Sequence, residues 1–242
     1  MSWRRRVMTI VLSVVAGSAM VGCERLPGKP TDQERWVPPS AVKDFASLYG
    51  QNCSGCHGAD GRLGPARPLN DPLYLALVTD DALYAAIANG TGDASMPAFA
   101  QQAGGSLTDT QIAVLVTQMR ARWGRPDQFV NAVLPPYSVQ DALAKGSAPG
   151  APQRGRVVYE TFCLHCHGED GQGGTQGSAI VDPAYLALVS DQTLRTTVIV
   201  GRADLHKPDW RANLANQPMR PQDISDVVAW LASQRPAGVM SP

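Results

Sequence analysis

The sequence predicts an all-α protein in which two tandem domains are joined by a proline-rich linker. Three observations predict this fold class. The stretch DPLYLALVTD at residues 71–80 recurs almost unchanged as DPAYLALVSD at residues 182–191. The motif CSGCH at residues 53–57 recurs as CLHCH at residues 163–167, and both pairs occur in the same order. Within each copy, apolar residues stand three and four positions apart, which is the spacing of amphipathic helices.

The repeat sets the expected domain boundaries. We expect the first domain at residues 40–123 and the second domain at residues 152–236. Residues 124–151 hold several prolines and little periodicity. We therefore interpret them as the linker, with a short helix near residues 137–145.

Each domain is expected to open and close with a helix. The opening helix of the first domain is expected at residues 40–49, with Ser40 as its N-cap. Closing helices are expected at residues 108–123 and 221–234, where apolar residues form one stripe. The glycine-rich stretch after each CxxCH motif is expected to be irregular.

The composition includes few of the large side chains that would fill two independent hydrophobic cores. Aromatic residues make up 6% of the chain, while glycine and proline number 23 and 19. So few large side chains indicate that something other than side chains fills the two interiors. Lys and Arg number 21, as do Asp and Glu. This balance gives no sign of a nucleic-acid partner.

The N-terminus is expected to be a targeting signal. Residues 4–6 are arginines, and the apolar run that follows is shorter than the about 20 residues of a membrane-spanning helix. The run ends in MVGC at Cys23, which resembles the lipobox of bacterial lipoproteins. The resemblance implies a signal peptide at residues 1–22, a lipid on Cys23 and a tether over residues 23–39. The alternative is an ordinary signal peptide with an incidental cysteine.

The two CxxCH motifs carry the chemistry. Two thiols one helical turn apart can add to the vinyl groups of one haem, and the adjoining histidine can bind its iron. A thioredoxin-like motif would need a βαβ pattern, and a four-cysteine zinc site would not explain a histidine after each pair. We therefore expect two covalently bound haem c groups. The residues that hold them would be Cys53, Cys56, His57, Cys163, Cys166 and His167.

Each copy resembles a class I c-type cytochrome domain. The shared features are an opening helix, CxxCH, a glycine-rich loop, short helices, a Met-Pro loop and a closing helix. The resemblance covers residues 40–123 and 152–235. It implies that the closing helix crosses the opening helix, with haem filling the core between them. That arrangement would account for the scarcity of aromatic side chains.

In the first copy, the resemblance implies further site residues. Met96, followed by Pro97 and Phe99, matches the loop that supplies the sixth iron ligand. The alternative is that Met96 only packs in the core. The segment at residues 64–65, Gly-Pro, matches the one whose carbonyl accepts the hydrogen bond of the proximal imidazole.

The second copy departs from the pattern at residues 202–210, RADLHKPDW, because Lys207 takes the place of the methionine. A lysine must lose its proton to bind iron, which costs roughly 4–5 kcal/mol at pH 7, whereas a histidine loses its proton almost freely. We therefore take His206 as the sixth ligand of the second haem. Lys207, Met219 and a vacant position are the alternatives, and both loop residues could instead face solvent. The proximal side departs too, since residues 174–175 lack a proline.

These features predict an electron-transfer protein without catalysis of its own. We interpret the chain as a lipid-anchored carrier on the periplasmic or extracytoplasmic face, or as a subunit of a respiratory complex. Its partners would then be redox proteins such as an oxidase. The alternative is a dihaem, peroxidase-like enzyme or a small-ligand sensor that uses an open or switchable second haem.

Unequal sixth ligands predict two different reduction potentials. A thioether ligand generally raises the potential, so Met96 should make the first haem the stronger electron acceptor. Spectropotentiometry of the purified protein should resolve two midpoints. A single transition with two identical His/Met spectra would contradict this expectation.

Overall fold

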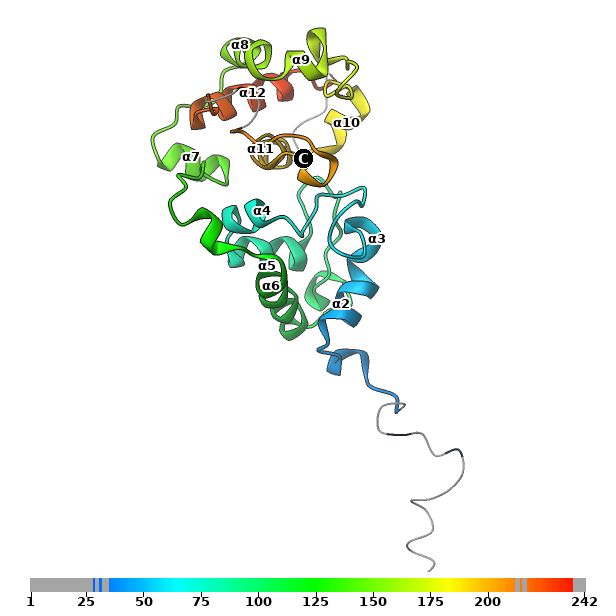
Figure 1. Ribbon diagram of the computed structural model, residues 1–242. Helices are drawn as coiled ribbons and strands as arrows, with labels where there is room; N and C mark the ends of the chain where they lie inside the picture. Colours follow the sequence, from blue (N-terminus) through cyan, green and yellow to red (C-terminus); the bar gives the residue numbers. More distant parts are fainter. Residues whose placement is uncertain (1–27, 29–30, 32–34, 212–213, 215–216, 237–242) are drawn as a thin grey trace, which may run out of the picture. The chain divides into compact units, whose positions relative to one another are not determined.

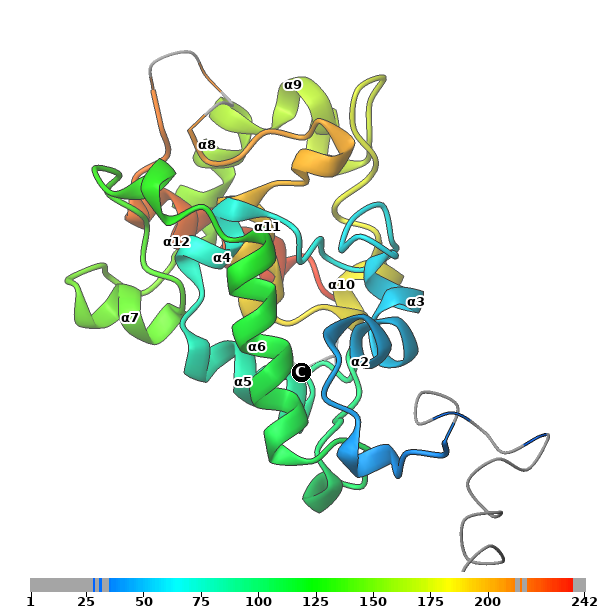
Figure 2. The ribbon, with the colours of Figure 1, turned by 60° about the horizontal axis from the view of Figure 1, so that its bottom comes forward.

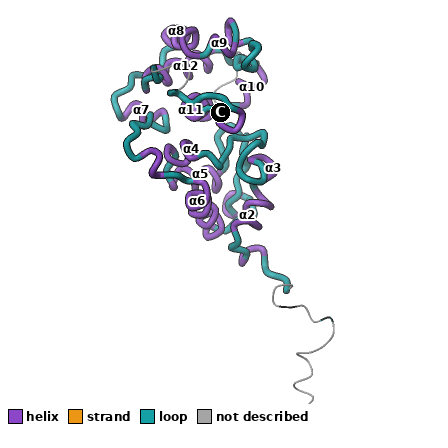
Figure 3. The backbone as a smooth tube through the Cα atoms, in the orientation of Figure 1, coloured by secondary structure: helices purple, strands orange, loops and turns teal. Residues whose placement is uncertain are grey.

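The computed structural model describes residues 28, 31, 35–211, 214 and 217–236. The expected signal peptide and Cys23 lie outside the described residues. Every regular element in the described part is a helix, and the only β features there are two isolated bridges, Ala100–Leu107 and Arg202–Lys207. The all-α prediction is confirmed (Figures 1 and 3). None of the described helices has the length and apolar character needed to cross a bilayer.

The described residues fall into two units, one ending at Ala41 and the other beginning at Val42. The first unit contains the short 3-10 helix η2 (Pro39–Ala41). From Val42 onward, both copies of the repeat lie in the second unit, which is described below.

The first copy contains five helices and one 3-10 turn among its described residues. They are α2 (Phe45–Asn52), α3 (Ser54–His57), α4 (Pro72–Leu77), α5 (Asp80–Asn89), η3 (Gln101–Ala103) and α6 (Asp109–Trp123). The closing helix was predicted correctly, and Thr108 caps it. The opening helix was predicted to begin too early. Its N-cap is Asp44 rather than Ser40, because the Asp44 carboxylate accepts a hydrogen bond from the Ser47 amide at 2.8 Å.

The second copy repeats this order among its described residues. It contains α8 (Pro152–Phe162), α9 (Leu164–His167), η5 (Glu169–Gly171), α10 (Pro183–Leu188), α11 (Asp191–Val200), η6 (Ala203–Leu205) and α12 (Pro221–Ser233). Between the copies lie η4 (Pro126–Phe129) and α7 (Val139–Ala144). Helix α7 corresponds to the short helix expected near residues 137–145.

In each copy the opening helix packs against the closing helix. The aromatic rings of Phe45 and Tyr49 on α2 lie 5.7 and 5.2 Å from that of Trp123 at the end of α6. In the second copy the rings of Tyr159 and Trp230 are 4.3 Å apart, and Figures 1 and 2 show α12 lying along α8. Gly155 permits this approach, since a Cβ there would lie 2.0 Å from the Asp226 carbonyl oxygen. In both copies an aromatic contact thus joins the opening helix to the closing helix.

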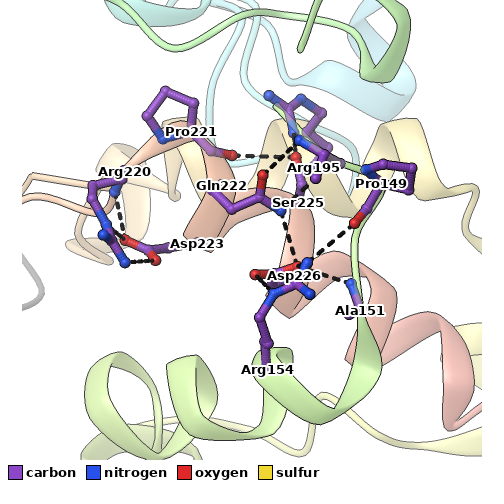
Figure 4. A network of polar contacts seen from close by, with 11 residues as sticks. Pro149, Ala151, Arg154, Arg195, Arg220, Pro221, Gln222, Asp223, Ser225 and Asp226 are labelled. Atoms are coloured by element: carbon purple, nitrogen blue, oxygen red, sulfur yellow. Dashed lines mark hydrogen bonds and ion pairs between the residues drawn. The ribbon is translucent and has the colours of Figure 1, made fainter. Parts of the chain in front are cut away.

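A buried carboxylate joins the opening and closing helices of the second copy. Figure 4 shows Asp226 of α12 facing Arg154 of α8. The Asp226 carboxylate accepts hydrogen bonds from Arg154 at 2.7 and 2.8 Å, from the Ala151 amide at 2.8 Å and from Gln222 at 3.1 Å. Burial by itself raises the pKa of Asp226, but these hydrogen bonds outweigh it and leave the pKa below its ordinary value.

A buried arginine ties α11 to the stretch between the copies. Arg195 is 1% exposed. Its guanidinium donates to the Pro136 carbonyl at 2.8 Å and to the Ser225 hydroxyl at 3.2 Å. Burial lowers the pKa of Arg195, yet the main-chain carbonyls satisfy its donors. These hydrogen bonds attach α11 to its neighbours through one buried side chain, and Figure 4 shows Arg195 beside Ser225.

We predict that the Asp226→Asn substitution lowers the free energy of unfolding by about 1–3 kcal/mol at neutral pH, because it leaves buried donors with a weaker acceptor. A carboxylate with a lowered folded pKa stabilises the fold above its unfolded pKa. That stabilisation is lost as the pH falls through the folded pKa. The difference between wild type and variant should therefore shrink in acid, as measured by chemical denaturation at several pH values.

The matched control is Glu160→Gln, which removes the carboxylate of the exposed Arg156–Glu160 pair. We expect no measurable change there. Equal destabilisation by both substitutions would contradict the account of Asp226.

Candidate functional site

The two CxxCH motifs adopt the same backbone conformation. The first cysteine of each motif, Cys53 or Cys163, is the C-cap of the opening helix, and a single helical turn follows it. The amides of His57 and His167 each donate to the carbonyl of the first cysteine of their motif at 3.0 Å. One helical turn thus carries both thiols and the imidazole of each motif.

Each motif histidine is held by a main-chain carbonyl. Nδ1 of His57 lies 2.7 Å from the Arg67 oxygen, and Nδ1 of His167 lies 2.8 Å from the Ser178 oxygen. A carbonyl can only accept, so Nδ1 carries the hydrogen and Nε2 keeps its lone pair. Burial also lowers the pKa of His57, which favours the neutral ring that a metal requires.

The proximal acceptor differs from the one expected. The expected segment at residues 64–65 packs instead against the backbone of the CxxCH motif. The contact is so close that a Cβ on Gly64 would lie 2.2 Å from the Cys56 oxygen. The Ala66 amide donates to that same oxygen at 2.9 Å. The chain leaves this turn with the Arg67 carbonyl facing the imidazole. The second copy keeps the contact through Ser178, so the missing proline at residues 174–175 does not remove it.

None of the four motif cysteines is paired in a disulfide among the described residues, so all four are available to attach haem. Burial raises the pKa of Cys53 to about 11 and that of Cys163 to about 12, and the neighbouring thiol of each motif adds to the effect. Neither thiol therefore ionises at neutral pH. Among the described residues, no group of three or more His, Cys, Asp or Glu side chains is arranged so that it could hold a metal ion.

These features fit haem c. Two thiols and an imidazole with a free Nε2 on one turn are the groups that haem c requires. The thiols would attach the porphyrin, and the imidazole would bind the iron. In addition, Nη1 of Arg67 is buried and makes no hydrogen bond within the described residues. A guanidinium in that state suits a bound group that carries carboxylates, as haem does.

The loop at residues 90–99 carries Met96, which is partly buried against the core. The Thr91 amide donates to the Met96 carbonyl at 3.0 Å, and the Met96 amide donates to the Thr91 hydroxyl at 3.1 Å. Asp93 lies at the centre of this loop. Its Oδ1 accepts from the hydroxyls of Thr91 and Ser95, both at 2.6 Å.

Asp93 was not among the site residues expected from the sequence. It is 8% exposed, and although burial favours its protonated form, its hydrogen bonds hold the pKa well below the ordinary range. A threonine two positions before an aspartate and a serine two positions after it could have indicated a self-bonded loop.

In the corresponding loop of the second copy, Lys207 occupies the position equivalent to Met96, as the alignment of the two copies predicted. The Arg202 amide donates to the Lys207 carbonyl at 3.3 Å, as Thr91 does to Met96. His206 is exposed and has a left-handed backbone with φ 56°. Nζ of Lys207 donates to the Gln176 carbonyl, in the loop after the second CxxCH motif.

Met219 occupies the position of Leu107 and packs in the core. It is 2% exposed, and its amide donates to the Trp210 carbonyl at 3.0 Å, as the Leu107 amide donates to Phe99 at 2.8 Å. The identity of the sixth ligand at the second site stays a prediction.

The loops of the two sites also contact each other. The Leu63 amide donates to Oδ2 of Asp204 at 3.0 Å, and Arg202 donates to the Gly64 carbonyl at 3.2 Å. The loop after the first CxxCH motif is thus bonded to the RADLHKPDW loop of the second copy. Sequence analysis did not predict this contact, since the repeat describes each copy but not how the copies meet.

We predict that Gly64→Ala reduces haem attachment at the first site and lowers the free energy of unfolding by about 1–3 kcal/mol, because the added Cβ would collide with the motif backbone. Haem staining and thermal unfolding measure the two effects. Gly55→Ala is the control, since Gly55 lies between the same two cysteines and a Cβ there meets nothing within 4 Å. Equal behaviour of the two variants would overturn this interpretation of Gly64.

Comparison with known proteins yields a family match for each copy. Residues 40–117 match the family described as cytochrome c oxidase, cbb3-type, subunit III, and residues 152–235 match the family described as cytochrome c.

Several curated proteins are similar to much of the chain. It is 26% identical over 197 residues to the cbb3-type cytochrome c oxidase subunit FixPc of Rhizobium leguminosarum bv. viciae, covering 75% of this chain and 60% of that protein. It is 28% identical over 192 residues to the CcoP subunit of Azospirillum sp. (strain B510), covering 72% and 57%. The CcoP subunit of Cereibacter sphaeroides is 30% identical over 192 residues, with 74% and 58% covered.

The chain thus spans somewhat more than half the length of these relatives. The two family matches fall on the two copies of the repeat, and each contains one CxxCH turn with its carbonyl-bonded histidine. The chain therefore carries two cytochrome c domains in tandem, and this layout matches that of a dihaem class I c-type cytochrome with covalently bound haem c.

Proposed function

We propose that the chain is a dihaem electron-transfer protein that serves a respiratory oxidase. The observation that carries the proposal is the repeated CxxCH turn, in which a carbonyl holds Nδ1 of His57 at 2.7 Å and Nδ1 of His167 at 2.8 Å. This contact fixes the ring orientation and leaves Nε2 available to iron. Two such sites in one chain would provide two redox centres between which electrons can pass.

At the first site, Cys53 and Cys56 would bind haem through thioether bonds, His57 would be the proximal ligand and Met96 the distal ligand. When bound, haem supplies a one-electron redox centre. The polypeptide supplies the ligands and holds them in place. Met96 is suited to its role because the hydrogen bonds of Thr91 fix the main chain on both sides of its side chain.

At the second site, Cys163 and Cys166 would attach haem and His167 would be the proximal ligand. His206 is our proposed distal ligand, with Lys207 and Met219 as alternatives. A neutral imidazole is available to iron near pH 7, whereas a lysine must first be deprotonated. Met219 is supported less well, because it already packs in the core.

The partner and the location are also part of the proposal. The relatives named above are cbb3-type cytochrome c oxidase subunits, which favours a respiratory oxidase as the electron acceptor. A lipid on Cys23 would hold the two domains on the periplasmic or extracytoplasmic face of the membrane. The tether at residues 23–39 would let them reach the partner.

A second candidate function is a peroxidase-like enzyme or a small-ligand sensor. It is favoured by one observation, the lysine that stands opposite Met96 in the second domain. Lys207 also lines a pocket of about 310 Å³ together with Asp71, Val200 and Arg211. A small molecule could approach the RADLHKPDW loop from this side.

Carbon monoxide distinguishes the two functions. A carrier with two filled axial positions should show no change in its reduced absorption spectrum when the gas is added. Removing the proposed ligand by His206→Ala should then open the second haem to carbon monoxide. The matched control is His165→Ala, since His165 is also an exposed, non-proximal histidine of the second domain.

Rapid binding of carbon monoxide to the wild-type protein would favour the enzyme or sensor. An unchanged electron paramagnetic resonance spectrum of the oxidised His206→Ala variant would exclude His206 as the ligand. A change in that spectrum on Lys207→Ala, which introduces no new ligand, would point to Lys207 instead.

A further inference from the structure

Helix α11 of the second domain contacts the proximal side of the first site. Nη2 of Arg67 donates to the Thr197 hydroxyl at 2.9 Å and approaches the Thr193 carbonyl at 3.5 Å. The carbonyl of the same Arg67 accepts the hydrogen bond from Nδ1 of His57 at 2.7 Å. One residue therefore connects the proximal imidazole of the first domain to a helix of the second.

The same helix contacts the distal side of the first site. Oδ2 of Asp93 accepts hydrogen bonds from the Ser190 amide at 3.1 Å and from the Thr193 hydroxyl at 2.9 Å. Oδ1 of Asp93 accepts from the Thr91 hydroxyl at 2.6 Å, and that hydroxyl accepts from the Met96 amide at 3.1 Å. A continuous chain of hydrogen bonds thus runs from the main chain of Met96 to the N-terminus of α11.

Helix α5, the counterpart of α11 in the first copy, lacks the residues that make these contacts. In the alignment of the repeats, Thr193 corresponds to Ala82 and Thr197 to Ala86 of the first domain, so α5 lacks both hydroxyls. Asp93 corresponds to Asp204, and each of these aspartates bonds to the other domain. Asp204 accepts from the Leu63 amide at 3.0 Å. The first site is therefore supported from outside its own domain on both sides of the haem position.

We propose that Thr193 and Thr197 of α11 are positioning residues for both axial ligands of the first haem, so that the second domain sets the ligation and the reduction potential of the first. The inference rests on the proposed function, because it requires haem at His57 and Met96. The orientation of the imidazole depends on its carbonyl partner, and such outer partners tune a bound metal. The Met96 loop depends on Asp93, whose charge strengthens the hydrogen bonds it accepts.

The test uses the full, haem-loaded chain with Thr193→Val and Thr197→Val combined, which replaces each hydroxyl by a methyl group of similar size. We expect a weaker far-red absorption band of the methionine–iron(III) bond and a lower midpoint potential at the first haem only. Each lost hydrogen bond should change the equilibrium constant for electron sharing between the haems roughly two- to tenfold. The double serine variant, which keeps both hydroxyls, should restore the wild-type values.

The matched control is Thr196→Val. Thr196 lies on the same helix and is 3% exposed, but within the described part of the chain its hydroxyl bonds to Gln192 alone, at 2.7 and 3.1 Å. This variant should leave the band and both potentials unchanged. If the double variant fails to fold, the same two measurements are made on Thr197→Val alone. We expect a smaller decrease in the far-red band and in the midpoint potential of the first haem.

An unchanged band and an unchanged potential in the valine variants, with both haems bound, would overturn the inference and leave the proposed function intact. An equal shift in Thr196→Val would also overturn it, because the effect would then come from α11 as a whole. Failure of the wild-type chain to bind haem at the first site would instead overturn the proposed function.

Discussion

The hydrogen bond from the ring nitrogen Nδ1 of His57 to the Arg67 carbonyl, copied between His167 and Ser178, is the contact on which both sites depend. It fixes the tautomer and the rotation of each imidazole before any metal arrives. The tight glycine turn against the Cys56 carbonyl brings the acceptor into place. Because the loop and the motif turn are packed together, the thiols and the imidazole of each copy form one preorganised unit.

The packing of the helices holds these units in place. The opening helix of each copy leads directly into the cysteine motif, and the closing helix packs against it through an aromatic contact. In the second copy, the buried Asp226 and Arg195 add polar contacts that fix α12 and α11. Rigid helices on both sides of a redox centre limit the rearrangement that accompanies a change in iron charge, which suits a protein whose task is electron transfer.

Much of the fold followed from the sequence. The repeat predicted two copies, and the apolar stripes predicted closing helices that the structure confirms at α6 and α12. The register that sets Lys207 opposite Met96 was also predicted. These features are local, or depend on comparing one copy with the other, so a single sequence contains them.

The rest depended on contacts between distant residues. The carbonyl that accepts the hydrogen bond of the His57 imidazole belongs to Arg67, not to the expected residues 64–65. A difference of two residues within a loop is decided by packing, which the composition of the loop does not reveal. Asp93 and Thr197 looked like ordinary polar residues. Their importance lies in the contact between the domains, which the internal repeat does not encode.

The central claim is that each half of the chain covalently holds its own haem. The most direct measurement is peptide mass spectrometry of a proteolytic digest, with the full chain made in a host that attaches haem c. We predict one haem on the peptide that contains Cys53 and Cys56, and one on the peptide that contains Cys163 and Cys166. An unmodified peptide from either motif, in protein that is otherwise folded and homogeneous, would contradict the account.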